Sequence, residues 1–164
     1  MDKQQEDVFW ETINTFDKVG LLRYVMIIGS WAEYIYSYYF TSDFTSSLRT
    51  TDLDFLYKNI RKPQRQINII SKLTQNGFVY KEECRDYMVT VPEPAAYVLH
   101  KLSINPMREP EKQSKDIRAL RELLKHINAS TNDNARLKII FDKLFKKQQK
   151  IILETADKNF IELM

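Results

Sequence analysis

Residues 24–32 read Tyr-Val-Met-Ile-Ile-Gly-Ser-Trp-Ala, and this stretch decides how we interpret the fold. The apolar run before Gly29 is typical of a short strand that is covered on both faces. Ser30 can then act as the N-cap of a helix, because its hydroxyl can accept a backbone hydrogen bond there. The sequence therefore predicts a strand over 24–28 and a helix over 31–40, although aromatic residues in this second segment would also suit a strand.

A second pattern, Thr-Asp-Leu-Asp-Phe-Leu-Tyr at residues 51–57, alternates like a strand. Because successive side chains of a strand point to opposite faces, Asp52 and Asp54 are expected on one face, with Leu53 and Phe55 on the other. Two adjacent carboxylates repel each other unless a cation lies between them, and Mg²⁺ prefers such oxygen ligands. The alternative is a pair of solvent-facing aspartates on a half-exposed strand.

The Gly-Ser pair adds a possible phosphate site. Gly29 has no Cβ, so a phosphate could approach its backbone. The helix that follows would offer N–H groups and the positive end of its dipole, and the Ser30 hydroxyl could bond to a phosphate oxygen. The order of strand, Gly-Ser, helix and Asp-x-Asp strand thus predicts a phosphate-binding turn beside a metal-binding strand.

The rest of the chain changes from a mixed to a helical pattern. We expect two helices that end at Gly20 and Gly77, strands over 78–81 and 87–91, and helices near 94–104, 111–128 and 132–157. The fold class is therefore α+β, a small mixed sheet with flanking helices and a helical C-terminal half. We place an α/β core at residues 1–92 and a helical region packed on it at residues 93–164.

Composition limits the class of protein. The 164 residues are 43% hydrophobic, which is enough to form a core and excludes a disordered chain. No apolar run is long enough to span a bilayer, and the polar start MDKQQEDVFW does not resemble a secretory signal. The single cysteine, Cys84, excludes an internal disulfide and a multi-cysteine zinc site. We therefore expect a cytoplasmic protein without a membrane partner.

The motifs also carry a resemblance to a known family. Residues 28–32 (IGSWA) followed by 51–56 (TDLDFL) resemble the signature of the polymerase-β-like nucleotidyltransferase superfamily. Residues 91–102 (VPEPAAYVLHKL), with Arg108 and the pair Lys115-Asp116, resemble the helical region of a bacterial nucleotidyltransferase-fold family. The resemblance covers about residues 22–128, most of the chain.

This resemblance implies transfer of NMP from an NTP to an acceptor hydroxyl, with release of pyrophosphate. Asp52 and Asp54 would bind two Mg²⁺ (or Mn²⁺) ions, which hold the attacking and leaving oxygens. Gly29 and Ser30 would hold the β- and γ-phosphates. Three basic residues could neutralise the triphosphate or the acceptor: Lys101, Arg108 and Lys115. The acceptor could be a nucleic acid, a protein or a small molecule.

One departure from the family concerns a third carboxylate, which active members carry on a later strand. Here only Glu82, Glu83 and Asp86 lie in the corresponding interval, at a predicted turn, and Glu83 is our candidate. A catalytically inactive binding module is therefore the alternative function. A third hypothesis is a helical adaptor, whose segment 132–164 recruits a partner or a second copy if its apolar stripe is exposed.

Overall fold

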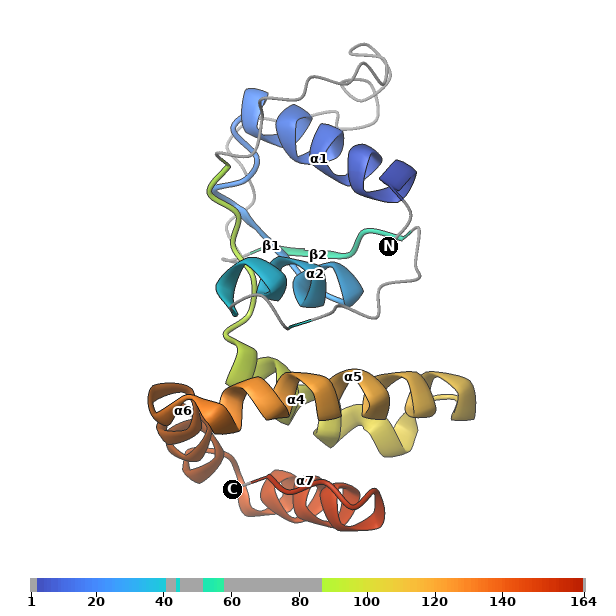
Figure 1. Ribbon diagram of the computed structural model, residues 1–164, viewed down its shortest axis with the longest axis vertical. Helices are drawn as coiled ribbons and strands as arrows, with labels where there is room; N and C mark the ends of the chain where they lie inside the picture. Colours follow the sequence, from blue (N-terminus) through green and yellow to red (C-terminus); the bar gives the residue numbers. More distant parts are fainter. Residues whose placement is uncertain (1–2, 41–43, 45–51, 58–86, 164) are drawn as a thin grey trace. The chain divides into compact units, whose positions relative to one another are not determined.

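The computed structural model describes residues 3–40, 44, 52–57 and 87–163 (Figure 1). These residues combine helices with a two-stranded antiparallel sheet and are mostly helical, which confirms the mixed fold class. Their contacts define two units. The first unit contains residues 1–32 and 47–91, and the second contains residues 33–46 and 92–164. The second unit therefore joins residues 33–46 to the helical C-terminal half.

In the first unit, helix α1 (Lys3–Lys18) packs its aromatic face against residues that are distant in the sequence. Phe9 is almost fully buried and stacks on Trp31, with ring centroids 4.2 Å apart and nearly parallel planes. Phe16 contacts Phe55 at 4.8 Å between centroids. These contacts bury aromatic residues on one face of α1 and form part of the core among the described residues of this unit.

The predicted helix end at Gly20 is confirmed. Gly20 has φ +68°, a left-handed conformation that glycine adopts without steric cost. Its N–H donates to the Asp17 carbonyl at 2.8 Å, and the Leu21 N–H donates to the Phe16 carbonyl at 2.8 Å. This pair of bonds satisfies carbonyls at the end of α1.

The sheet is shorter than we predicted. Strands β1 (Val25–Ile27) and β2 (Phe55–Tyr57) pair antiparallel, with Met26 opposite Leu56. The expected strand over 87–91 is wrong, because this segment is not a strand, although the Thr90 carbonyl accepts a hydrogen bond from the Ile27 N–H at 2.8 Å. This hydrogen bond alone does not define a strand. The helix expected to end at Gly77 and the strand over 78–81 lie outside the described residues.

The helix expected after Gly29 is confirmed as α2 (Ser30–Tyr39), and the strand alternative is wrong. The N-cap assignment needs a correction, because α2 begins at Ser30 itself. The Ala32 N–H donates to the Gly29 carbonyl at 3.2 Å, so Gly29 occupies the position before the first helical residue. Its positive φ of 67° lets the chain turn from β1 into α2 within two residues, Ile28 and Gly29, so that Gly29 rather than Ser30 occupies the N-cap position.

The second unit is built mainly from helices. They are α4 (Pro94–Ile104), the 3₁₀ turn η1 (Asn105–Met107), α5 (Pro110–Ala129), α6 (Thr131–Asp142) and α7 (Lys146–Lys158). Helix α4 packs against α5, α6 and α7, and α5 also packs against α6. Fully buried side chains from all four α-helices meet in this core: Val98, Leu102, Leu120, Ile127, Leu137 and Ile152. No helix of the described chain is long and apolar enough to cross a membrane.

The single long helix expected over 132–157 is wrong, because the chain breaks between α6 and α7. Two glutamines stabilise the break. The Gln148 side chain accepts from the Phe145 N–H at 3.3 Å, and the buried Gln149 side chain donates to the Phe141 carbonyl at 2.9 Å. Leu137 and Phe141, from the stripe that an adaptor would expose, are buried within this unit.

Candidate functional site

The turn between β1 and α2 lies directly against Asp54. A Cβ on Gly29 would lie only 2.8 Å from Oδ2 of Asp54, closer than real Cβ contacts allow. The Ile28 N–H donates to the Asp54 carbonyl at 3.0 Å, which fixes the two segments in register. The structure therefore brings together two predicted site residues, Gly29 and Asp54, that are far apart in the sequence.

Burial alternates along residues 52–55, which agrees both with the predicted shared face of the two aspartates and with the alternative of a solvent-facing pair. Asp52 and Asp54 are exposed, whereas Leu53 and Phe55 between and after them are partly buried. Both aspartates precede β2 rather than lying within it, so the strand begins later than expected. Two exposed carboxylates one residue apart provide the kind of oxygen ligands that Mg²⁺ or Mn²⁺ accepts, so the residues present fit such an ion.

The proposed third carboxylate lies outside the described residues, as Glu82, Glu83 and Asp86 all do. Within the part of the chain that the structure describes, no three side chains of His, Cys, Asp or Glu gather as a metal site. Glu83 as a third metal ligand therefore stays a prediction.

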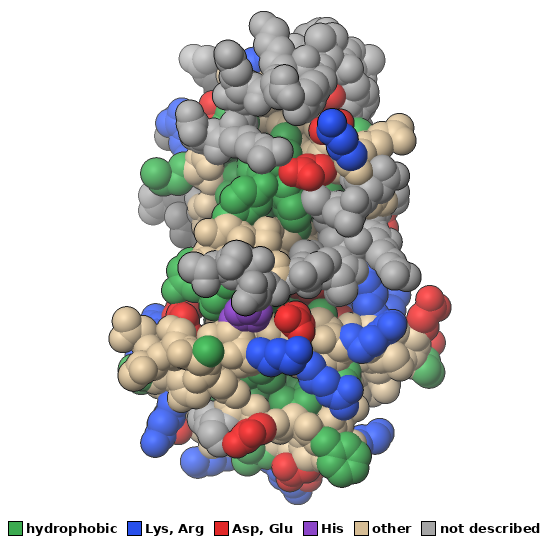
Figure 2. All heavy atoms as spheres, in the orientation of Figure 1, with side chains coloured by type: hydrophobic (Ala, Val, Ile, Leu, Met, Phe, Trp, Pro, Cys, Tyr) green, Lys and Arg blue, Asp and Glu red, His purple; other side chains and the backbone are tan. Residues whose placement is uncertain are grey.

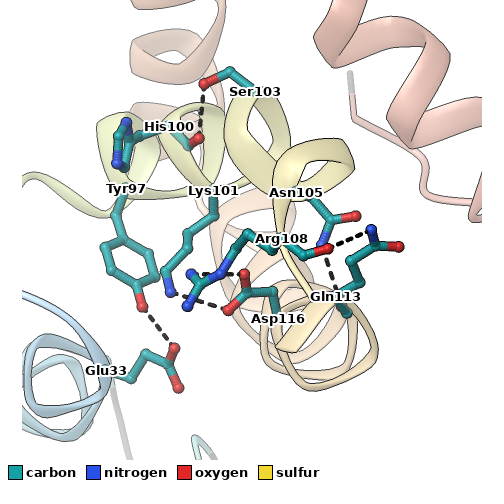
Figure 3. Close-up of polar contacts among 9 residues, drawn as sticks. All are labelled: Glu33, Tyr97, His100, Lys101, Ser103, Asn105, Arg108, Gln113 and Asp116. Carbon is teal, nitrogen blue, oxygen red and sulfur yellow. Dashed lines mark hydrogen bonds and ion pairs between the residues drawn. The ribbon is translucent and has the colours of Figure 1, made fainter. Parts of the chain in front are cut away.

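Two of the three predicted phosphate-binding cations meet on one acid in the second unit (Figure 3). The Lys101 ammonium donates to Oδ1 of Asp116 at 3.0 Å, and Nη1 of Arg108 lies 2.9 Å from Oδ2. The side chains of Lys101 and Asp116 are 11% and 7% exposed, whereas that of Arg108 is 28% exposed. Lys115, the third cation, precedes Asp116 on α5 and is partly buried.

A second buried contact lies beside this ion pair. The Tyr97 hydroxyl donates to Oε1 of Glu33 at 2.6 Å, and both residues are buried. Nζ of Lys101 lies 5.4 Å from the centre of the Tyr97 ring, on the same helix. Figure 3 shows the side chains of Tyr97 and Lys101 pointing from α4 toward Glu33 and Asp116, respectively. We name Glu33, Tyr97, Lys101, Arg108 and Asp116 the polar cluster.

Sequence reasoning missed Glu33, Tyr97 and Asp116 as members of this cluster. Glu33 carried a usable signal, because it is the only acid in the aromatic segment 31–40 and a charged residue in a buried helix needs a partner. Its partner Tyr97 had no such signal, because the two residues are 64 positions apart in the sequence. Asp116, which pairs with Lys101 and Arg108, had none either.

Burial controls protonation in the polar cluster. It raises the pKa of Glu33 above the ordinary value of 4.5, and this effect outweighs the opposing effects of the Tyr97 hydrogen bond and the Lys101 charge. Burial, together with the nearby Glu33 carboxylate, also raises the pKa of Tyr97 far above its usual range. Partial burial and the charge of Lys101 lower the pKa of His100. Tyr97 therefore stays protonated and remains a hydrogen-bond donor.

Replacing Glu33 by Gln is expected to change how stability depends on pH. Because the folded protein binds the Glu33 proton more tightly than the unfolded chain, its stabilising contribution is complete below pH 4.5 and is lost as the pH rises through the raised pKa. Gln can still accept the Tyr97 hydrogen bond without a charge. Urea unfolding should show the variant more stable than the parent near neutral pH, with the advantage vanishing toward acid.

The matched control is Glu111→Gln, an exposed acid in the first turn of α5. It should change the free energy of unfolding by no more than about 0.5 kcal/mol at any of these pH values. Parallel pH profiles for the parent and Glu33→Gln would contradict the role that we assign to burial.

Comparisons of this chain with protein-family models, with curated proteins and with solved structures found no match. The resemblance to nucleotidyltransferases therefore stays a prediction from the sequence, carried by residues 28–32, 51–56 and 91–102 with Arg108 and the pair Lys115-Asp116. What the structure adds is the geometry of the first unit, in which the glycine of one motif abuts the second aspartate of the other.

Proposed function

We propose that this protein binds an NTP with Mg²⁺ or Mn²⁺ at the Gly29-Ser30 turn and at Asp52 and Asp54. It would transfer NMP to an acceptor hydroxyl slowly or not at all. The observation that carries the proposal is the approach of the Asp54 carboxylate to Gly29, at 2.8 Å from the place of a Cβ. The Gly29-Ser30 turn suits a phosphate group, and Asp54 suits a metal cation. The same cation would also bind the phosphate.

Each of the site residues in the first unit has a distinct role in this proposal. Asp52 and Asp54 would hold the metal, which when bound neutralises phosphate charge and favours loss of the acceptor proton. Helix α2 begins at Ser30, so the positive end of its dipole lies at the same turn as Gly29 and attracts phosphate. The Ser30 hydroxyl could donate to a phosphate oxygen.

The structure changes how Gly29 can be tested. We expected its missing Cβ to leave room for phosphate, but the Asp54 carboxylate already occupies that side of the residue. A valine at this position would also strain a backbone with φ +67° and displace Asp54. Loss of NTP binding in Gly29→Val would therefore not separate a phosphate contact from a misplaced carboxylate, so substitutions of the aspartates are the better test.

The three predicted phosphate-binding cations, Lys101, Arg108 and Lys115, differ in how available they are to bind phosphate. Lys101 is nearly buried and bonded to Asp116, so its first role in the structure is to hold the polar cluster. Arg108 is more exposed and has five N–H donors, of which Asp116 uses few. Arg108 is therefore the more available of these two cations for an anionic group, and Lys101 positions it through their common partner Asp116, whereas phosphate contacts of Arg108 and Lys115 stay a prediction from the sequence.

The expected weakness of transfer follows from the ligand count. The ion that activates the acceptor needs more fixed oxygen ligands than two shared carboxylates provide. If Glu83 does not supply the third, the acceptor hydroxyl stays largely protonated while NTP still binds. A catalytically inactive nucleotide-binding module is therefore the second candidate, and transfer assays distinguish it from a slow enzyme.

Replacing Asp52 and Asp54 together by Asn is the experiment that tests the proposal. The change removes two charges with little change of shape, so calorimetry should show Mn²⁺-dependent NTP affinity reduced about tenfold or more. The melting temperature should hold or rise, because repulsion between the two carboxylates is relieved. Each of the four common NTPs should be titrated with and without Mn²⁺.

Asp17→Asn is the control, since Asp17 is an exposed acid of the same unit on α1. It should leave NTP affinity unchanged. Metal-dependent binding that survives in the double variant would refute the site. Rapid pyrophosphate release by the parent protein on addition of an acceptor would refute the impaired reaction and indicate a complete set of carboxylates.

A further inference from the structure

A groove in the second unit is lined by residues that are not members of the polar cluster. Its volume is about 670 Å³, within the range of roughly 300–1,000 Å³ that is usual for sites of small molecules. Its walls come from α5 and α7, and the corner formed by the end of α4 and η1 completes the lining. Helix α5 packs mainly against α4 and α6, and α7 packs mainly against α4, so α5 and α7 leave space between them.

Each wall presents one face of a helix. On α5 the lining residues include Ile117, Arg118 and Arg121, and on α7 they include Ile151 and Lys158. Spacings of three, four and seven residues place side chains on the same side of a helix, so each wall combines an apolar residue with a cation. The groove is therefore amphipathic, with isoleucines on both walls and positive charges beside them.

The charge of the groove is mainly positive and uncompensated. Among the residues described by the structure, no carboxylate forms an ion pair with Arg118, Arg121 or Lys158. The one acid of the lining, Glu154, lies 3.7 Å from Lys150 instead. Figure 2 shows Lys and Arg side chains gathered over the helical unit, with hydrophobic side chains between them.

One cation is held in place before any ligand binds. Nη2 of Arg121 donates to the Asn159 carbonyl at 2.8 Å, which links α5 to the end of α7 and orients the guanidinium at the groove. A preorganised cation loses less side-chain entropy on binding an anion than a free one does. Arg118 and Lys158 lie on the same two helices and add to the positive potential.

We propose that the groove between α5 and α7 binds a small amphipathic anion, an apolar body that carries one carboxylate or phosphate group. The body would contact Ile117 and Ile151, and the anionic group would bind Arg118, Arg121 or Lys158. The site belongs to the second unit, whereas Gly29, Ser30, Asp52 and Asp54 belong to the first. The two sites are therefore tested independently of each other.

Three naphthalene derivatives with a common apolar body test the proposal on the full chain: naphthoate, naphthyl phosphate and naphthylmethylamine. Titration followed by backbone amide NMR should show shifts at groove residues for the two anions and none for the amine. The stronger of the two anions identifies the preferred head group. Because the attraction is partly electrostatic at an open groove, added salt should weaken the binding of the anions.

Charge reversal at the groove supplies the decisive comparison. Arg118→Glu with Lys158→Glu should weaken binding of the preferred anion about tenfold or more. Lys138→Glu with Lys147→Glu is the matched control, because these exposed lysines of α6 and α7 are not part of the lining and the net charge changes equally. The control should bind like the parent, and circular dichroism should show both variants folded.

Two results would overturn the proposal. One is the absence of groove shifts with either anion up to millimolar concentration. The other is equal weakening in the groove variant and the control, which would mean that the anion responds only to net charge. Replacing Ile151, which is partly buried, by Ser should also weaken binding, and unchanged affinity there would refute the contact with the apolar body.

Discussion

Replacing Asp116 by Asn is expected to lower the free energy of unfolding by about 3–5 kcal/mol. Asp116 accepts from Lys101 at 3.0 Å and pairs with Arg108 at 2.9 Å, and its side chain is almost fully buried. Asn keeps the shape but not the charge, so the buried Lys101 ammonium loses its counter-ion. Chemical denaturation followed by circular dichroism measures the difference.

Glu122→Gln is the matched control for this prediction. Glu122 is also an acid on α5 in an ion pair, with Lys125 at 2.8 Å, but its side chain is 33% exposed and that of Lys125 is 71% exposed. Solvent screens such a pair, so we expect a loss of at most about 1 kcal/mol. Equal losses for the two variants would show that burial of the Asp116 pair is not what stabilises it.

A double variant separates the loss of attraction from the cost of an uncompensated charge. Adding Lys101→Met to Asp116→Asn removes the buried ammonium that the first substitution leaves without a counter-ion. The double variant should therefore be more stable than Asp116→Asn alone, and the double-mutant cycle gives the coupling between the two residues. If the two losses simply add, the two side chains do not interact as the structure indicates.

Replacing Phe9 by Ala is expected to lower the free energy of unfolding of the first unit by about 3–5 kcal/mol. Phe9 is 1% exposed and stacks on Trp31 at 4.2 Å between ring centroids. The substitution removes the whole buried ring, leaves a cavity beside Trp31 and removes the aromatic contact. Tryptophan fluorescence during urea unfolding should report the change.

Val8→Ala, one residue earlier on the same helix, is the control for Phe9. Val8 is 45% exposed, so its replacement should cost no more than about 0.5 kcal/mol. The anion affinity of the groove in the second unit should remain in Phe9→Ala under conditions where both units are folded. A stability change for Phe9→Ala as small as that of the control would contradict the stacked core.

Local patterns in the sequence predicted much of the first unit. The apolar run before Gly29, the two-residue spacing of Asp52 and Asp54 and the glycine after α1 each depend on backbone preferences and periodicity over a few residues. Such signals are visible without knowledge of the rest of the chain. They predicted β1, α2 and the end of α1 correctly, and they placed β2 within a longer strand than the structure has.

Local patterns were less informative where the end of a helix is stabilised by side chains of another helix. Nothing between residues 142 and 146 resembles a helix breaker, because the segment contains neither glycine nor proline. The break between α6 and α7 is stabilised by the side chains of Gln148 and Gln149, which satisfy backbone groups at the corner. A polar residue in a helix has many possible partners, and the sequence does not show which one it meets.

By itself, the sequence determined the candidate residues and their local setting: a glycine at a strand-to-helix turn, two aspartates on one face of an alternating segment, and a helical C-terminal half. Only the tertiary structure decided that Asp54 lies against Gly29 and that Asp116 is the common partner of Lys101 and Arg108. It also decided that Glu33 binds Tyr97. The physical reason is the distance along the chain between the residues that decide each feature. Turns and the alternation of strand faces follow from neighbouring residues. Ion pairs and buried hydrogen bonds between distant residues form only after packing has brought them together and removed water from around them.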